Sequence, residues 1–356
     1  MKNKHPTHMK AAILRECGKP LSIEEGIEIP ALEKGQVLIK MAYSGVCRSQ
    51  LMEVEGSRGQ DKYLPHLLGH EGSGMVISTG QGVTKISEGD WVILGWIKGK
   101  GFNAQGAKFK KGNESINSGA VTTFSTYTIA SENRLVPIPH GIPKDIAVLF
   151  GCALPTGAGI VLNEIKPKKG SSIAFIGLGG IGLSGLMATK AFDCKDIIAI
   201  DVSQKKLDFA KNFGVTQTIN AKHEDVASKV LEITEGKGVD YSVEAAGQTE
   251  TIELAFDIIR SDGGECIFAS HPEKGKKISI DPFDLISGKN IRGSWGGNSL
   301  PDQDTPILAD LYNKGMMPLE DLITKTYSLD EINQAFDDLK KSNVFRPLIV
   351  IDSALK

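Results

Sequence analysis

The chain has 356 residues, 24% of them charged, and a formal net charge of −2 at pH 7, so we expect two globular domains without a basic surface for nucleic acid. No apolar run approaches the length of a membrane span, and the first ten residues lack the apolar segment of a signal peptide. Five cysteines scattered over this length do not make a disulfide framework, which favours a reducing cytoplasm.

The N-terminal part of the chain is expected to be rich in β-strands. Short apolar stretches at 9–15 and 21–29 predict a hairpin, and residues 37–43 alternate as a strand does. Glycine and proline turns separate further short strands, which is typical of a barrel or an irregular sandwich. Residues 97–119 are rich in glycine, lysine and asparagine and predict a long surface loop.

Strands and helices alternate from about residue 173 to 291, which predicts βαβ units and a parallel sheet. A helix over 204–213 is expected to end at Gly214. Near the C-terminus we expect a helix over 329–340 and a final strand over 346–351 that returns to the first domain. The strands of the parallel sheet are expected at 173–176, 197–200, 217–219, 241–243 and 266–269.

The stretch from Ser172 to Asp201 carries the most specific motif. A short apolar strand runs directly into a G-x-G-x-x-G sequence, which is followed by an apolar helix, a second strand and an acid. The first glycine allows a tight turn, the second lets a pyrophosphate approach the backbone, and the third lets the helix pack on the strand. The helix N-terminus offers unpaired N–H groups to the phosphates. We therefore predict dinucleotide contacts from Gly177, Gly179, Gly180, Ile181 and Gly182.

Asp201 follows this motif by about 20 residues, where a carboxylate binds the ribose hydroxyls. It would repel a 2′-phosphate, and no arginine follows it directly, so we predict NAD rather than NADP. Lys205 and Lys206 lie a few residues further on and leave the preference open. The alternative is an ordinary glycine-rich turn in an α/β unit.

Three other residues are candidate metal ligands. Cys47 follows a predicted strand, His70 lies between Gly69 and Glu71, and Cys152 follows Gly151. Each alone is well explained as a buried residue of the core. Together, two thiolates and one imidazole would hold zinc with its fourth position open, which is the catalytic arrangement.

These features occur in one order along the chain. The segments 45–49, 69–71 and 151–152, the glycine loop and the segment 293–297 resemble the zinc-dependent alcohol dehydrogenases of the medium-chain dehydrogenase/reductase superfamily over nearly the whole length. Two cysteines and one histidine are the known ligands of the catalytic zinc ion in alcohol dehydrogenase. The resemblance implies an α/β protein that forms a homodimer or homotetramer. A distorted β-barrel, the GroES-like catalytic domain, would comprise 1–153 and 295–356, and a Rossmann domain with a doubly wound parallel sheet would comprise 154–294.

The resemblance also implies roles for single residues. Cys47, His70 and Cys152 would bind one catalytic zinc ion, and Ser49 would take the alcohol proton. Glu71 would lie behind the metal, as an occasional ligand or simply as a buried acid. The remaining expected contacts are Arg48, Thr156, Lys206 and Arg346 to the cofactor, where either arginine could instead be an ordinary surface residue, and Trp96 and Phe124 to the substrate, where both could equally be core aromatics.

The implied reaction is reversible hydride transfer between an alcohol, expected to be primary, and NAD, giving an aldehyde or ketone. Residues 97–119 contain no cysteine, so no structural zinc is expected there. Gln50 replaces the acid that usually orients the zinc-bound histidine, and its amide oxygen could accept the imidazole N–H instead. Met52 replaces a histidine of the usual proton relay, so the proton would leave through the cofactor ribose and water.

Two other functions stay open at this point. One is a zinc-free reductase of quinones or enones, which metal analysis would distinguish. The other is a nucleotide-binding protein with little turnover, which a broad panel of alcohols would distinguish. The sequence does not indicate which alcohol or aldehyde is used, or in which direction.

Overall fold

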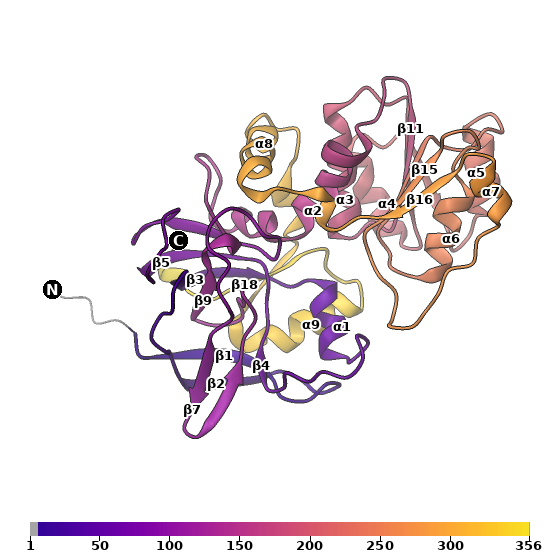
Figure 1. Ribbon diagram of the computed structural model, residues 1–356. Coiled ribbons are helices and arrows are strands. Elements are labelled where there is room, and N and C mark those ends of the chain that lie inside the picture. Colours follow the sequence, from indigo (N-terminus) through magenta and orange to yellow (C-terminus); the bar gives the residue numbers. More distant parts are fainter. Residues whose placement is uncertain (1–5, 356) are drawn as a thin grey trace. The chain divides into compact units, whose positions relative to one another are not determined.

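A computed structural model describes residues 6–355, so the first five of the ten residues considered above as a signal peptide lie outside the described residues (Figure 1). The chain divides into two compact units. Unit 1 contains the chain up to residue 152 together with 300–313 and the segment from 318 onward, and unit 2 contains 153–299 and 314–317. The expected junctions were after residues 153 and 294.

Unit 1 contains a closed barrel. The sequential pair β1 (His8–Leu14) and β2 (Ser22–Glu28) is antiparallel, which confirms the predicted hairpin. The surface loop predicted for 97–119 is wrong in its second half, because a β-hairpin forms there and buries Phe109 and Ile116 completely. Each of these two short strands contributes one buried apolar residue to the core cluster that lies against the barrel strands. The other barrel strands are β7 (Lys108–Lys111), β8 (Glu114–Asn117) and β4 (His66–Leu67).

A seven-stranded sheet forms the rest of the β-structure in unit 1. Its last strand in the sequence, β18 (Pro347–Val350), pairs with β3 (Gln36–Gly45), which confirms that the C-terminal strand returns to the first unit. The order is β10 (Leu135–Pro137), β6 (Trp91–Leu94), β5 (Gly72–Thr79), β3, β18 and β17 (Lys325–Ser328), and β9 (Tyr127–Ser131) also pairs with β3.

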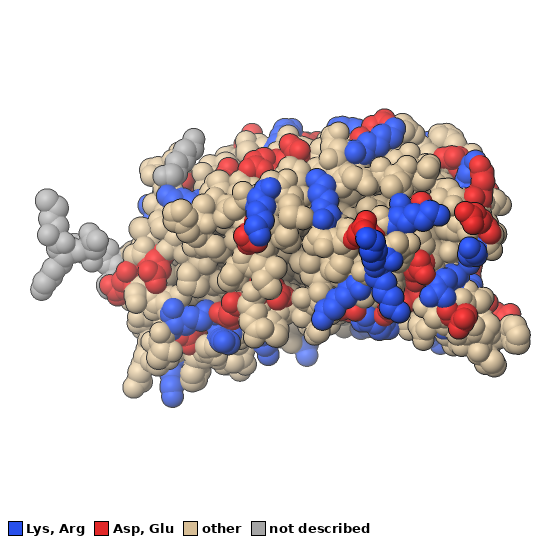
Figure 2. Space-filling view, turned by 90° about the horizontal axis from the view of Figure 1, so that it is seen from above, with Lys and Arg blue, Asp and Glu red and all other residues tan. Residues whose placement is uncertain are grey.

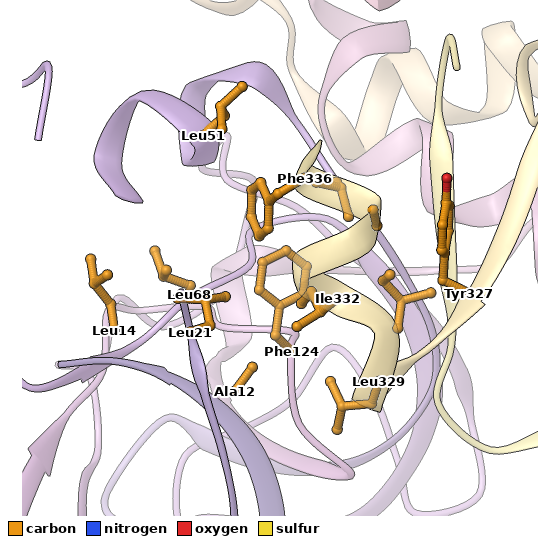
Figure 3. Packing of buried hydrophobic residues seen from close by; sticks show 13 residues of the cluster. Ala12, Leu14, Leu21, Leu51, Leu68, Phe124, Tyr327, Leu329, Ile332 and Phe336 are labelled. Carbon is orange, nitrogen blue, oxygen red and sulfur yellow. The ribbon is translucent and has the colours of Figure 1, made fainter. Parts of the chain in front are cut away.

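The helices of unit 1 cover an apolar cluster shown in Figure 3. The helix predicted near 329–340 is present as α9 (Ile332–Lys340), preceded by a 3-10 turn, and its Ile332 and Phe336 are buried. Leu51 of α1 (Arg48–Val54) belongs to the same cluster. This packing fixes α1, whose first turn carries several of the predicted site residues. The remaining helical elements include the 3-10 turn η2 (Ile146–Gly151) and α8 (Pro301–Asn313).

Unit 2 is built on the predicted parallel sheet. All five predicted strands are confirmed, and a sixth, β16 (Asn290–Gly293), was not anticipated because half of its four residues are polar. The chain reverses direction across the sheet between β11 and β14, which is where doubly wound sheets bind their ligands. The order is β13 (Gln217–Asn220), β12 (Asp196–Asp201), β11 (Ser172–Ile176), β14 (Tyr241–Glu244), β15 (Glu265–Phe268) and β16.

Helices connect these strands. The predicted helix at 204–213 is present as α4 (Gln204–Ala210) with a terminal 3-10 turn, and Gly214 follows in the left-handed region at φ 93°. The other helices of unit 2 are α2 (Ala153–Gly159), the π-helical turn η3 (Ile160–Ile165), α3 (Gly180–Ala188), α5 (Val226–Ile233), α6 (Thr249–Asp257) and α7 (Pro282–Ile286).

The charged surface is mixed. On the face shown in Figure 2, Lys and Arg side chains are interspersed with Asp and Glu, as the net charge of −2 suggests. Within residues 6–355, the helices are all too short or too polar to cross a bilayer.

Candidate metal centre and dinucleotide loop

The three predicted metal ligands lie together in unit 1. The Sγ atoms of Cys47 and Cys152 are 3.9 Å apart, and Nε2 of His70 is 3.2 Å from Sγ of Cys152. All three ligand atoms lie within 4.8 Å of one another. A tetrahedral zinc ion, with bonds of about 2.3 Å to sulfur and about 2.0 Å to nitrogen, holds its ligand atoms roughly 3.5–3.8 Å apart. The donor set and its spacing therefore fit a single zinc ion.

Each ligand is placed by a different backbone element. Cys47 is the N-cap of α1, and its backbone N–H donates to the side chain of Gln50 at 2.8 Å in a capping box. His70 follows Gly69, whose φ of 92° and close neighbour Thr123 leave no room for a side chain. Cys152 follows the 3-10 turn η2. The N-cap of α1, the turn at Gly69 and the end of the 3-10 turn η2 thus bring the three ligand atoms together.

The role expected for Gln50 is wrong. Its Oε1 accepts the Cys47 N–H instead of an imidazole N–H, because the capping box draws the side chain back towards the helix start. Its Nε2 is buried and finds no hydrogen-bond partner in the part of the chain that the structure describes. Gln50 therefore holds the backbone of one ligand rather than the ring of another.

The two sulfurs interact strongly. A hydrogen bond from Cys152, aided by His70, outweighs burial and holds the pKa of Cys47 well below its usual range. The same hydrogen bond and burial raise the pKa of Cys152 well above its usual range. One thiolate is therefore stabilised by its neighbours, and a bound divalent cation would stabilise the second.

A buried ion pair backs this cluster. Glu71 is fully buried and accepts a hydrogen bond from Nη2 of Arg346, which is 5% exposed. Burial raises the pKa of Glu71, although the charge of Arg346 opposes the shift. Gly45 and Gly151 leave room for this acid, since an added Cβ would come within 2.7 Å and 2.8 Å of its side chain. The alternative that Arg346 is a surface residue is therefore wrong.

The other residues predicted in unit 1 are distributed differently. Oγ of Ser49 lies 3.4 Å from Sγ of Cys47, so it joins the ligand cluster. The backbone N–H of Trp96 donates to Gly151, one residue before a predicted ligand. Arg48 is exposed at the start of α1.

Phe124 is a residue of the core. It is 1% exposed, and its ring packs edge-on against Phe336 with the ring centroids 6.0 Å apart (Figure 3). Of the two readings given for it, the core aromatic is therefore the one that its packing supports.

In unit 2, the glycine loop has the geometry that its motif predicts. Gly177 has a φ of 89°, and a Cβ there would lie 2.6 Å from the backbone of Ala246. A Cβ on Gly182 would lie 2.0 Å from the Gly177 carbonyl. At Gly179, by contrast, a Cβ would meet no described atom within 4 Å, so this glycine borders open space. Gly180 and Ile181 begin α3 directly after it.

Asp201 ends β12 beside this loop. Its Oδ2 accepts the Leu178 N–H at 2.8 Å and its Oδ1 accepts the Ser203 N–H at 2.9 Å. Nζ of Lys206 lies 3.6 Å from Oδ2. The predicted ribose ligand thus also fixes the loop that would hold the pyrophosphate. Thr156 is buried in α2.

Sequence reasoning missed Glu244 at the end of β14. This buried carboxylate accepts hydrogen bonds from the N–H groups of Ala246 and Gly247 and from Thr251, which shapes the turn packed against Gly177. Burial raises its pKa. An acid at the carboxyl end of a buried parallel strand was the available signal.

Comparison with known proteins gives a consistent result. Residues 33–140 match the alcohol dehydrogenase GroES-like domain family, and residues 180–314 match the zinc-binding dehydrogenase family. The chain is 32% identical to the alcohol dehydrogenase class-P of Arabidopsis thaliana, over 96% of this chain and 97% of that protein. Alcohol dehydrogenase 2 of Zea mays is also 32% identical, over 95% and 96%.

Solved structures agree. The alcohol dehydrogenase zinc-binding domain protein from Burkholderia ambifaria superposes with a TM-score of 0.89 at 30% identity, covering 97% of this chain and 99% of that one. Benzyl alcohol dehydrogenase from Acinetobacter calcoaceticus gives a TM-score of 0.88 at 30% identity with the same coverage.

Proposed function

The chain belongs to the zinc-dependent alcohol dehydrogenases of the medium-chain dehydrogenase/reductase superfamily, and from this premise we propose which residues perform its chemistry. It is a zinc-dependent and NAD-dependent alcohol oxidoreductase. The proposal is that Cys47, His70 and Cys152 hold one catalytic zinc ion, and that a primary alcohol is oxidised there to an aldehyde, reversibly.

The observation that carries this proposal is the convergence of three ligand atoms from distant parts of the sequence. Two thiols and one imidazole lie within 4.8 Å of one another, next to a buried acid. Two sulfurs and one nitrogen leave the fourth tetrahedral position for a substrate oxygen. A zinc-free reductase of enones would have no use for such a set.

Zinc in such a site supplies a Lewis acid that polarises the oxygen of the alcohol or carbonyl compound. The chain supplies the rest. Ser49, 3.4 Å from Sγ of Cys47, takes the hydroxyl proton of the alcohol, because its Oγ can both accept and donate. Next to the ligands, Glu71 is fully buried and its charge is compensated by Arg346 in an ion pair.

A bound nicotinamide cofactor would supply the hydride acceptor, and unit 2 would hold it. The open space at Gly179 and the N-terminus of α3 would receive the pyrophosphate. Asp201 would accept hydrogen bonds from the ribose hydroxyls, with Lys206 beside it. Thr156, Arg48 and Arg346 remain proposed cofactor contacts.

We also propose a homodimer or homotetramer formed through unit 2. Strand β16 lies at the edge of the six-stranded sheet, and such an edge offers free backbone groups for pairing with another copy. Light scattering coupled to size-exclusion chromatography would measure the mass in solution.

The test combines a zinc assay with an activity panel. Purified protein is expected to contain one zinc per chain and to reduce NAD with ethanol, 1-butanol or benzyl alcohol, monitored by NADH absorbance. Binding of NAD without turnover of any alcohol or aldehyde in a broad panel would contradict the proposal. A metal-free protein with full activity would do the same.

A further inference from the structure

A cavity of about 300 Å³ lies within unit 1 and begins at one of the proposed zinc ligands. Its lining includes His70, together with Gln50 and Glu53 of α1 and with His66 and Asn117. Because Nε2 of His70 belongs to the ligand set, the cavity adjoins the proposed metal site on the side of this residue. Its volume is at the lower end of the range for small-molecule sites.

One wall of the cavity carries a buried donor that the fold does not use. Gln50 is 1% exposed, and its Oε1 is engaged by the Cys47 N–H at 2.8 Å. Its Nε2 meets no acceptor among residues 6–355. Buried side-chain donors almost always have a partner, so an orphan that lines a cavity indicates an acceptor on a bound molecule.

The neighbouring wall carries an acceptor. Glu53 lies three residues after Gln50 on α1, so the two side chains share one face of the helix. The contacts of its carboxylate are long: Oε1 is 3.8 Å from Nε2 of His66, and Oε2 is 3.4 Å from Nη1 of Arg58. A carboxylate has about four lone-pair sites, so Glu53 retains capacity to accept.

The second acid near the cavity, Asp61, already has a hydrogen-bond partner in His66. Oδ2 of Asp61 lies 2.8 Å from Nε2 of His66, whose Nδ1 is 2.9 Å from the Leu67 carbonyl. Both ring nitrogens of His66 are thus engaged within unit 1, and Asp61 already has a close partner. Glu53 is thus the acceptor that remains available to a ligand beside Gln50.

We propose, building on the function proposed above, that this cavity binds a second hydroxyl group of the substrate. A hydroxyl is the smallest group that can accept from Nε2 of Gln50 and donate to the carboxylate of Glu53 at the same time. The substrate class is therefore short diols and polyols, with one hydroxyl at the reacting centre and another in the cavity. Gln50 and Glu53 are the residues that determine this specificity.

The test compares substrates that differ only in this hydroxyl. For the zinc-loaded protein with NAD, kcat/KM is measured with 1-propanol, 1,2-propanediol and 1,3-propanediol. We expect at least one diol to exceed 1-propanol by about tenfold, the effect of one charge-assisted hydrogen bond. Glu53→Ala is expected to reduce the ratio of diol to 1-propanol about tenfold.

Two further variants separate specificity from structure. Gln50→Glu retains an acceptor for the Cys47 N–H and replaces the amide donor by a carboxylate oxygen, so it also lowers the ratio. Glu55→Ala is the matched control, because Glu55 ends the same helix but pairs with Lys340 at 2.7 Å. The control is expected to leave the ratio and the zinc content as they are in the natural protein.

Other results would overturn the inference. Equal kcat/KM for 1-propanol and both diols, unchanged in Glu53→Ala, would exclude a hydroxyl subsite while the proposed alcohol oxidation stands. Preference for 3-amino-1-propanol over both diols would show that Glu53 acts alone on a cation. A second metal equivalent per chain that Glu53→Ala removes would show that Glu53, Asp61 and His66 bind a cation there. No turnover of any alcohol by zinc-loaded protein would contradict both proposals.

Discussion

The two units assemble their functional residues in opposite ways. In unit 2, the glycine loop and Asp201 come from one βαβ segment, β11 to β12, so neighbours in sequence become neighbours in space. In unit 1, the candidate ligands are residues 47, 70 and 152, and the ion pair behind them joins residue 71 to residue 346. The first site depends on local backbone geometry, whereas the second depends on the packing of the whole unit.

This difference explains where strain and polarity are concentrated. The dinucleotide loop needs glycines because of one tight turn and one close approach, at Gly177 and Gly182. The metal centre instead needs buried charges and donors held by distant partners. Changes at the metal centre of unit 1 should therefore affect the metal, the stability and the activity together, whereas changes at the dinucleotide loop of unit 2 should affect cofactor binding and leave the zinc content unchanged.

The largest effect is expected from Cys152→Ser. Loss of one thiolate should remove zinc and lower kcat/KM by more than about 100-fold, while NADH binding in unit 2 is retained. Zinc content is measured by elemental analysis and NADH binding by fluorescence. Cys194→Ser is the matched control in unit 2. Equal loss of zinc, NADH binding and fold would show that Cys152 is structural.

Arg346→Met should destabilise unit 1 next most strongly. It leaves the carboxylate of Glu71 buried without its partner, and breaking a buried pair in this way costs about 3–5 kcal/mol. The free energy of unfolding is measured in urea. The double variant Arg346→Met with Glu71→Gln should recover part of the loss, because no charge is then left unpaired. A single variant as stable as the natural protein would show that the pair is dispensable.

Asp201→Gly should change cofactor choice without changing the zinc content of unit 1, although it also removes the acceptor of the Leu178 and Ser203 N–H groups. Removing the carboxylate relieves repulsion of a 2′-phosphate and leaves Lys206 free to contact it, so the ratio of NADP to NAD use should rise about tenfold. Steady-state kinetics with both cofactors measures this ratio. An unchanged ratio would contradict the ribose role, and a loss of zinc would contradict the independence of the two units.

The smallest effect is expected from Glu24→Gln, on the free energy of unfolding at acidic pH. In the barrel of unit 1, hydrogen bonds from Arg15, aided by Lys111 and opposed by burial, lower the pKa of Glu24 from 4.5 to about 2. A carboxylate with a lowered pKa stabilises the fold above its unfolded pKa, and that contribution is lost as the pH falls towards 2. The free energy of unfolding should therefore decrease less steeply between pH 4.5 and 2 in Glu24→Gln. Identical slopes would exclude this contribution.

The sequence by itself determined what is written locally. The strand positions of unit 2, the hairpin of β1 and β2, and the end of the helical segment 204–213 at Gly214 follow from periodicity and turn chemistry, which act over a few residues. The family followed from motifs spread along the chain. The three candidate metal ligands were grouped by residue type before their distances were known, and the structure brings their ligand atoms within 4.8 Å of one another. Their role as ligands stays a prediction.

Only the tertiary structure decided how those residues are used. Gln50 caps Cys47 instead of orienting His70, and Phe124 packs in the core, because both outcomes depend on side chains that compete for one space. The hairpin within 97–119 forms because Phe109 and Ile116 find a barrel to fill. These side-chain positions depend on contacts with residues that are distant in the sequence. A local sequence pattern does not specify those residues.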